Sequence, residues 1–340
     1  MHRGGGLVLI VFLAVTGCGA AHIGQSPASE TRNSALPSAS PAVTTPPSAN
    51  VCANTPPPAA VTRMSVAYVS SKQQIFQFGG DDARNTPLAE TWVLGNQCWA
   101  KVTPGASPTP RDTATVAYDA ARDIVVLYGG RGGAPGLPAQ FLYDTWVWDS
   151  KAWHLASVIG PRLIAPAAAY DPNAREVIMF GSTAGGIAET WAWDGLTWRQ
   201  LHPAASPDAR LAASLTLDVT SNHLLLFGGD QTLQPVSETW AWDGSNWQNI
   251  NPPASPSARF GAAMASYESG RLVVLNGGLS RSELKNDTWV WDGRTWTEQH
   301  PSHVPTSPGG TIAVDTGQAL ELIGSQGAVW SWSGTDWVAA

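Results

Sequence analysis

The ten residues 189–198, ETWAWDGLTW, contain the pattern that decides the fold. Trp191 and Trp193 are two residues apart, so in a β-strand their rings lie on the same face of the sheet. A tight Asp-Gly turn follows at Asp194, and Trp198 opens the next strand. The segment is therefore expected to form two neighbouring antiparallel strands.

This segment recurs along the chain from Arg63 onward. An acid–Thr–Trp motif, in which the acid is Asp or Glu, occurs at residues 90–92, 144–146, 189–191, 238–240 and 287–289, with a degenerate copy at residues 328–330. The copies are roughly 40 to 55 residues apart, which is the period of several propeller repeats. All 17 Trp lie in the strands that begin with these motifs or in the strands that follow them.

Each copy has the same internal order. A run of small residues comes first, followed by a polar turn and a β-branched apolar run such as residues 124–128. In four copies this run ends in a glycine pair, and the acid–Thr–Trp strand follows. The residues that we assign to the structural motif are Gly79, Gly80, Gly129, Gly130, Gly228, Gly229, Gly277, Gly278, Trp146, Trp191, Trp240 and Trp289. The pair is weakened to Gly-Ser at residues 181–182 and 324–325.

The repeats predict an all-β fold, a six-bladed β-propeller of four-stranded antiparallel blades. One such sheet cannot bury both of its faces alone, whereas six sheets stacked around an axis can, and they leave only short edges exposed. The innermost strand must be slim where the blades converge. The small-residue runs, such as residues 167–169, meet this requirement.

The glycine pair, the later Trp and the spacing between them resemble the kelch repeats of the galactose-oxidase-type central domain. The resemblance covers residues 59–340 and implies a kelch-type propeller. The chain departs from the family in its Trp-Asp-Gly-x-x-Trp turn, which replaces a looser spacing, and in its eroded first and sixth copies.

The N-terminus is expected to be a targeting signal. Residues 1–17 have a short basic start and an apolar run at 7–15, which is too short to span a bilayer and is typical of a signal peptide. Residues 15–18 resemble a bacterial lipobox, which implies a lipid on Cys18; the alternative is an ordinary secretory signal cut nearby. Residues 18–58 are rich in Pro, Ser, Thr and Ala and predict a disordered tether. The expected location is the outer surface of the cell membrane.

Two further cysteines, Cys52 and Cys98, are predicted to form a disulfide in this oxidising compartment. The bond would attach the start of the folded domain to its first blade. The alternative is two separate thiols.

One face of the propeller collects the variable loops between second and third strands and the Pro-rich links between blades. Loops on a rigid scaffold often carry binding residues. The candidate ligand-binding residues on this face are Arg111, Arg131, Phe141, Tyr143, Arg210, Asp230 and Arg259. Alternatively, the repeated arginines pair with neighbouring acids or carbonyls, and the long loop 131–143 is a tolerated insertion.

Function is expected to be binding of a protein or glycan partner outside the cytoplasm, by a monomer. The net charge of −7 argues against nucleic acid. The alternative is a propeller enzyme acting on carbohydrate, because galactose oxidase resembles this architecture and uses copper. His202 and His300 occupy the same repeat position, which favours a structural role, and no catalytic constellation appears in the sequence. No enzymatic activity, cofactor or metal is therefore expected.

Overall fold

The computed structural model describes residues 58, 62–95, 98–133, 138–267, 271–305, 312–316, 319–324 and 328–339. The fold of these residues is all-β, and their single short helix is a 3-10 turn at Ser70–Lys72. The predicted signal peptide and nearly all of the predicted tether lie outside the described residues.

The strands pair into antiparallel sheets of four, numbered here one to six in chain order. Sheets one to three contain β1 (Ser65–Val69), β2 (Gln74–Phe78), β3 (Thr91–Gly95) and β4 (Cys98–Val102); β6 (Thr115–Asp119), β7 (Ile124–Tyr128), β10 (Thr145–Trp148) and β11 (Trp153–Ser157); and β12 (Leu163–Asp171), β13 (Glu176–Thr183), β14 (Ala188–Trp193) and β15 (Trp198–Leu201).

Sheets four to six contain β16 (Ser214–Asp218), β17 (His223–Phe227), β20 (Thr239–Trp242) and β21 (Trp247–Asn249); β22 (Ala263–Tyr267), β23 (Leu272–Leu279), β24 (Leu284–Trp291) and β25 (Trp296–Gln299); and β26 (Ile312–Asp315), β27 (Leu320–Ile323), β28 (Val329–Trp332) and β29 (Trp337–Ala339). Short strands at the loop ends form a ribbon of β5 (Arg111–Asp112), β8 (Arg131–Gly132) and β9 (Gln140–Phe141), and a pair of β18 (Asp230–Gln231) and β19 (Gln234–Pro235).

The hairpin predicted from residues 189–198 is present, and its turn has a clear cause. Asp194 accepts the backbone N–H groups of Leu196 and Thr197 on one carboxylate oxygen, each at 2.8 Å. Gly195 has a φ of 97°, a left-handed conformation that glycine adopts without steric cost. The aspartate of the Trp-Asp-Gly-x-x-Trp motif therefore fixes the turn between the last two strands of the sheet.

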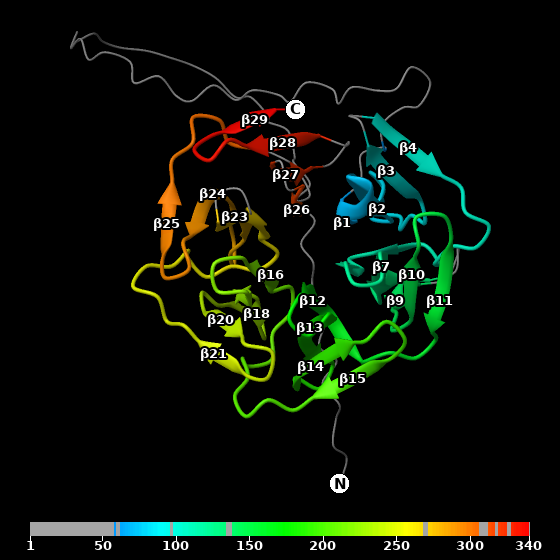
Figure 1. The fold of residues 1–340 in the computed structure, drawn as a ribbon, viewed down its shortest axis with the longest axis horizontal. Coiled ribbons are helices and arrows are strands. Elements are labelled where there is room, and N and C mark those ends of the chain that lie inside the picture. Colours follow the sequence, from blue (N-terminus) through cyan, green and yellow to red (C-terminus); the bar gives the residue numbers. More distant parts are fainter. Residues whose placement is uncertain are drawn as a thin grey trace, which may run out of the picture. The chain divides into compact units, whose positions relative to one another are not determined.

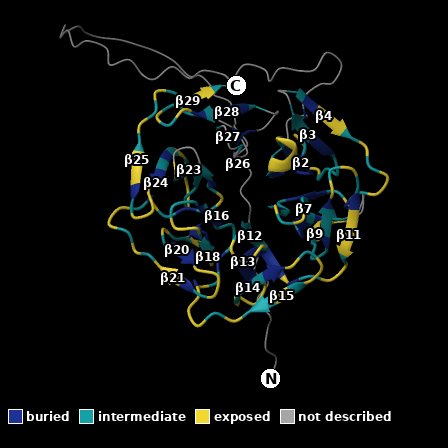
Figure 2. Cartoon of the chain, viewed as in Figure 1, coloured by how far each residue is buried: buried dark blue, intermediate teal, exposed yellow. Residues whose placement is uncertain are grey.

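Each sheet buries its middle strands against its neighbours. Phe76 and Phe78 of sheet one share a core cluster with Val125, Trp148 and Trp153 of sheet two. Exposed residues lie along the outer strands, for example β4, β11 and β25 (Figure 2). The first strands contact one another in the order β1, β6, β12, β16, β22 and β26, and β26 in turn contacts β1. Of these strands, β1, β12, β16 and β26 are labelled around the centre of Figure 1.

Polar bonds also join neighbouring sheets at their outer strands. The Trp that opens the fourth strand donates its indole N–H to the Thr of the acid–Thr–Trp motif in the preceding sheet. The donor–acceptor pairs are Trp153–Thr91, Trp198–Thr145, Trp247–Thr190, Trp296–Thr239 and Trp337–Thr288, all 2.9–3.0 Å apart. These Trp–Thr hydrogen bonds therefore hold one sheet against the next.

Candidate binding site

The acid of the acid–Thr–Trp motif lies at the loop end of the third strand. In each described copy it accepts the indole N–H of the Trp two residues later. The pairs are Trp92–Glu90, Trp146–Asp144, Trp191–Glu189, Trp240–Glu238 and Trp289–Asp287, at 2.7–3.0 Å. This bond fixes the direction of the carboxylate and leaves its remaining lone pairs for another donor.

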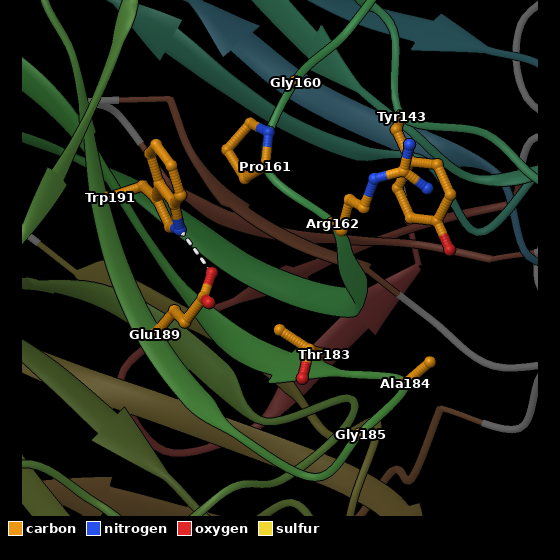
Figure 3. Close-up of a pocket in the computed structure, with 9 residues that line it drawn as sticks. All are labelled: Tyr143, Gly160, Pro161, Arg162, Thr183, Ala184, Gly185, Glu189 and Trp191. Atoms are coloured by element: carbon orange, nitrogen blue, oxygen red, sulfur yellow. Dashed lines mark hydrogen bonds between the residues drawn. The ribbon is translucent and has the colours of Figure 1, made fainter.

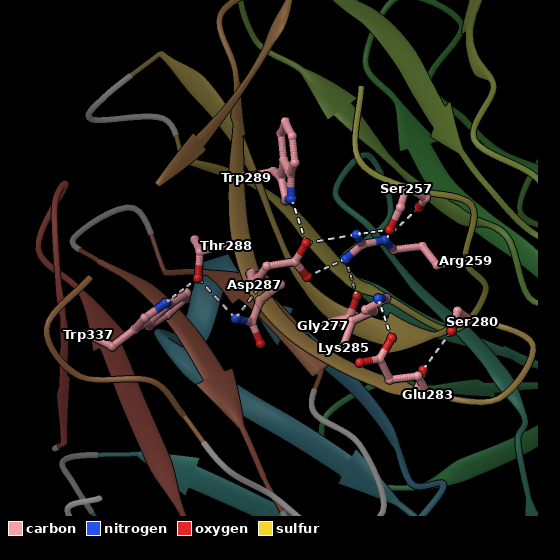
Figure 4. A network of polar contacts seen from close by, with 11 residues as sticks. Ser257, Arg259, Gly277, Ser280, Glu283, Lys285, Asp287, Thr288, Trp289 and Trp337 are labelled. Atoms are coloured by element: carbon pink, nitrogen blue, oxygen red, sulfur yellow. Dashed lines mark hydrogen bonds and ion pairs between the residues drawn. The ribbon is translucent and has the colours of Figure 1, made fainter. Parts of the chain in front are cut away.

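In three sheets that second donor is a buried arginine from the link before the first strand. Arg259 forms a two-pronged ion pair with Asp287, at 2.5 and 2.8 Å (Figure 4). It also donates to the carbonyl of Gly277 and, through Nε, to the carbonyl of Ser257. Arg111 pairs in the same way with Asp144, and Arg210 pairs with Glu238 through one nitrogen at 2.6 Å.

These ion pairs determine the charge of the acids. Burial raises the pKa of Asp287, but the hydrogen bonds from Arg259 and Trp289 outweigh it, so the pKa lies below its ordinary value. The same balance lowers the pKa of Asp144 and of Glu238. The three carboxylates are therefore held ionised.

Sheet three keeps the acid and the tryptophan but lacks the ion pair. Arg162 precedes Leu163, which pairs with Thr183 as Asp112 pairs with Arg131, so Arg162 occupies the position of Arg111. Its guanidinium lies over the ring of Tyr143 instead, 5.5 Å from the ring centre. Within the part of the chain that the structure describes, no Lys or Arg pairs with Glu189.

A cavity of about 510 Å³ lies where the ion pair would be. It is lined by Tyr143, Gly160, Pro161, Arg162, Thr183, Ala184, Gly185, Glu189 and Trp191. In Figure 3, Glu189 and Trp191 stand on one side, Arg162 and Tyr143 on the other, and residues 183–185 close the lower edge. We call this space the third-sheet pocket.

Two local features distinguish the link that carries Arg162. Thr109 and Ser257, two residues before Arg111 and Arg259, accept a guanidinium N–H on their hydroxyls, and Asp208 accepts one from Arg210 on its backbone carbonyl, whereas Gly160 has no side chain. In addition, the hydroxyl of Tyr128 donates to the carbonyl of Pro161 and accepts the N–H of Leu163. The link is therefore held by Tyr128 rather than by its own arginine.

Gly160 is needed for this arrangement. A Cβ at this position would lie 2.6 Å from the carbonyl oxygen of Tyr143 and 2.9 Å from the ring of Tyr128. The N–H of Gly160 donates to the same carbonyl of Tyr143 at 2.7 Å. The close approach of the link to the second sheet thus requires glycine and shapes one wall of the pocket.

The pocket offers both charges and two aromatic walls. Glu189 can accept hydrogen bonds, Arg162 can donate them, and Thr183 can do either. Exposed aliphatic side chains stand next to the lining residues along the chain: Val158 and Ile159 are 70% and 72% exposed, and Ile187 is 61% exposed. The pocket thus combines hydrogen-bonding groups with exposed aliphatic side chains nearby in the chain.

The candidate residues predicted from the sequence have different environments. Tyr143 lines the pocket. The three repeated arginines, Arg111, Arg210 and Arg259, are buried in the ion pairs described above. This arrangement matches the alternative interpretation, in which these arginines pair with neighbouring acids.

The remaining candidates lie along the loop ends. Arg131 pairs with Asp112 at 2.8 Å, and Phe141 is half-buried opposite it in the β5–β8–β9 ribbon, so part of the predicted loop is a short sheet. Asp230 lies opposite Pro235 in the β18–β19 strand pair, and burial raises the pKa of the Asp230 carboxyl.

The motif residues take part in the sheets. Among the motif tryptophans, Trp146, Trp191, Trp240 and Trp289 each donate to an acid, as described above. The glycine pairs Gly79–Gly80, Gly129–Gly130, Gly228–Gly229 and Gly277–Gly278 all have positive φ, between 61° and 107°. Side chains rarely adopt this conformation, which explains the glycine pair.

Cys98 is disulfide-bonded. Its predicted partner, Cys52, lies outside the described residues, as does the predicted lipidation site, Cys18.

Arg162 and Glu189 were not singled out from the sequence. The signal that could have found them is the comparison of equivalent repeat positions: an arginine and an acid are present, but Gly160 stands where the links with a paired arginine have Thr109, Asp208 and Ser257.

No protein-family model matches the chain, and no curated protein is similar to it at a significant level. Among the described residues, no cluster of three or more His, Cys, Asp or Glu side chains could hold a metal ion. None of these residues forms a helix that is long and apolar enough to cross a bilayer.

Proposed function

We propose that the chain is a six-bladed, kelch-type β-propeller, tethered to the outer face of the cell membrane, that binds a protein or glycan partner. The order of contacts among first strands supports closure of the ring, because β26 contacts β1 as each first strand contacts the next. A buried cluster containing residues of sheets one and six adds to this support.

The membrane tether is supported by the sequence of residues 1–58: the apolar run, the lipobox-like residues before Cys18 and the Pro-rich segment that follows. A folded domain on such a tether is suited to meeting partners beyond the membrane surface.

Binding is supported by one observation above all: the third-sheet pocket. Three sheets fill the equivalent place with their own arginine, and the third sheet leaves it open. The pocket lies between the link 158–162 and the turn 183–187, on the face where binding residues were expected.

Partner capture from membranes tests this proposal. The intact lipoprotein is compared with a variant in which residues 132–141 are replaced by a short Gly/Ser turn, and with Glu189→Gln. A partner that the intact protein retains and either variant loses supports the binding module and locates its surface. Failure of the intact protein to retain any protein or glycan contradicts it.

A further inference from the structure

The chain itself shows what chemical group fits beside the Trp–carboxylate pair. In sheets two and five, the carboxylate that accepts the Trp indole also receives two guanidinium N–H bonds, at 2.5–2.9 Å. In sheet four it receives one, at 2.6 Å. Each guanidinium group is completely buried. The pair is thus a guanidinium receptor in three of its copies.

Sheet three has the same receptor without its guanidinium. Trp191 donates to Glu189 Oε2 at 2.8 Å, as Trp146 and Trp289 donate to their acids. The arginine of this sheet lies over Tyr143, and the pocket takes its place. Glu189 is the one acid of the five described motif copies without a cationic partner, since Glu90 pairs with Lys101.

We propose that the third-sheet pocket receives the guanidinium group of an arginine side chain from a protein partner. The inference rests on the binding function proposed above and names its ligand. The guanidinium pairs with Glu189 as Arg111 and Arg259 pair with their acids, in a planar, two-pronged contact that lysine cannot reproduce. The planar group lies beside Glu189 and Trp191, on the side of the pocket opposite Arg162 and Tyr143 (Figure 3).

The surroundings of the pocket favour a protein over a glycan. Val158, Ile159 and Ile187 are exposed beside the lining residues and offer aliphatic surface to the neighbours of the inserted arginine. Arg162, on the opposite wall, can pair with an acidic group of the same partner. The partner is therefore a chain with an exposed arginine flanked by apolar and acidic residues.

The test uses the full-length chain in detergent micelles and the probe N-acetyl-arginine methylamide, titrated by saturation-transfer NMR. We expect saturable binding that Glu189→Gln weakens by at least about tenfold, because the charge-assisted bonds are lost. Glu189→Asp is the matched control. It keeps the probe within roughly threefold of the wild-type affinity, because aspartate performs this role in sheets two and five. The neutral isostere N-acetyl-citrulline methylamide binds at least about tenfold more weakly.

Several outcomes would overturn the inference. The wild-type chain could fail to bind the probe, or Glu189→Gln could bind it as well as the wild type does. Binding to Arg162→Ala but not to the wild type would show that Arg162 itself occupies the pocket.

Partner capture separates this failure from failure of the binding module. A partner that depends on Glu189 but is displaced by a glycan rather than by the arginine probe overturns the inference alone. If the probe does not bind and no partner is captured, the result contradicts both proposals.

Discussion

Trp99 of β4 and Val329 of β28 belong to the same buried hydrophobic cluster, which joins the first sheet to the last. Val329 stands where the other motif copies have Thr. Trp337 donates to Thr288 at 2.9 Å, whereas the buried Nε1 of Trp99 has no hydrogen-bond partner among the described residues. The contact between first and last sheets is therefore apolar where the contacts between the other sheets are polar.

Val329→Thr is expected to stabilise the protein by roughly 0.5–1.5 kcal/mol, because the new hydroxyl gives the Trp99 indole an acceptor. The free energy of unfolding, measured by denaturant titration, checks this. Val314→Thr is the control: it places a hydroxyl in the same cluster away from the motif position and is expected to destabilise. Equal destabilisation by both substitutions would contradict the prediction.

Thr239→Val is expected to lower the free energy of unfolding by about 1–3 kcal/mol. The substitution keeps the shape of the side chain but leaves the buried indole N–H of Trp296 without its acceptor. Thr297→Val, on the exposed side of β25, is the matched control and is expected to have little effect. A loss no larger than that of the control would refute the proposed bond between sheets.

The buried ion pairs predict an acid-sensitive fold. The pKa of Asp287 is lowered in the folded protein, so the unfolded chain binds the proton more tightly and stability falls as pH drops from about 5 toward the folded pKa. Arg259→Met should reduce this slope and cost roughly 3–5 kcal/mol at neutral pH, since it leaves a half-buried carboxylate unpaired.

Arg199→Met is the control for Arg259→Met. It breaks the more exposed pair with Glu176 and should cost less than about 1 kcal/mol. An unchanged acid slope in Arg259→Met would mean that Asp287 does not contribute to it.

Tyr128→Phe tests the cause of the third-sheet pocket. Phenylalanine already occupies the equivalent position in sheets one, three and four, as Phe78, Phe180 and Phe227, so the ring itself is accommodated. The loss of the hydroxyl leaves the buried carbonyl of Pro161 without this donor and should cost about 1–3 kcal/mol.

Tyr128→Phe should also weaken binding of the arginine probe by roughly fivefold, because Arg162, no longer held away by the link, competes for Glu189. Thermal unfolding and the NMR titration measure the two effects. Unchanged probe affinity would separate Tyr128 from the pocket.

The sheets could be predicted from the sequence because their signals are local. The alternation around Trp191 and Trp193 and the Asp-Gly turn at Asp194 depend only on neighbouring residues, and the repeats present them several times. The bond from Trp198 to Thr145 could not be predicted, because its partners are 53 residues apart and the repeat pattern does not say which sheet faces which.

The site was located only in part. The loop face and Tyr143 were expected, but Arg111, Arg210 and Arg259 were considered as ligand-binding residues and are buried. The pocket depends on the absence of a side chain at Gly160 and on the hydroxyl of Tyr128. Both effects appear only when the link is placed against sheet two. The sequence contains both Arg162 and Glu189, so the absence of an ion pair between them is difficult to recognise without the structure.

A crystal structure of the chain with N-acetyl-arginine methylamide tests the account most directly. We predict that the guanidinium of the probe lies within hydrogen-bond distance of Glu189 and beside Trp191, while Arg162 remains over Tyr143. A structure in which Arg162 itself pairs with Glu189 and the probe is absent from the pocket would contradict the account.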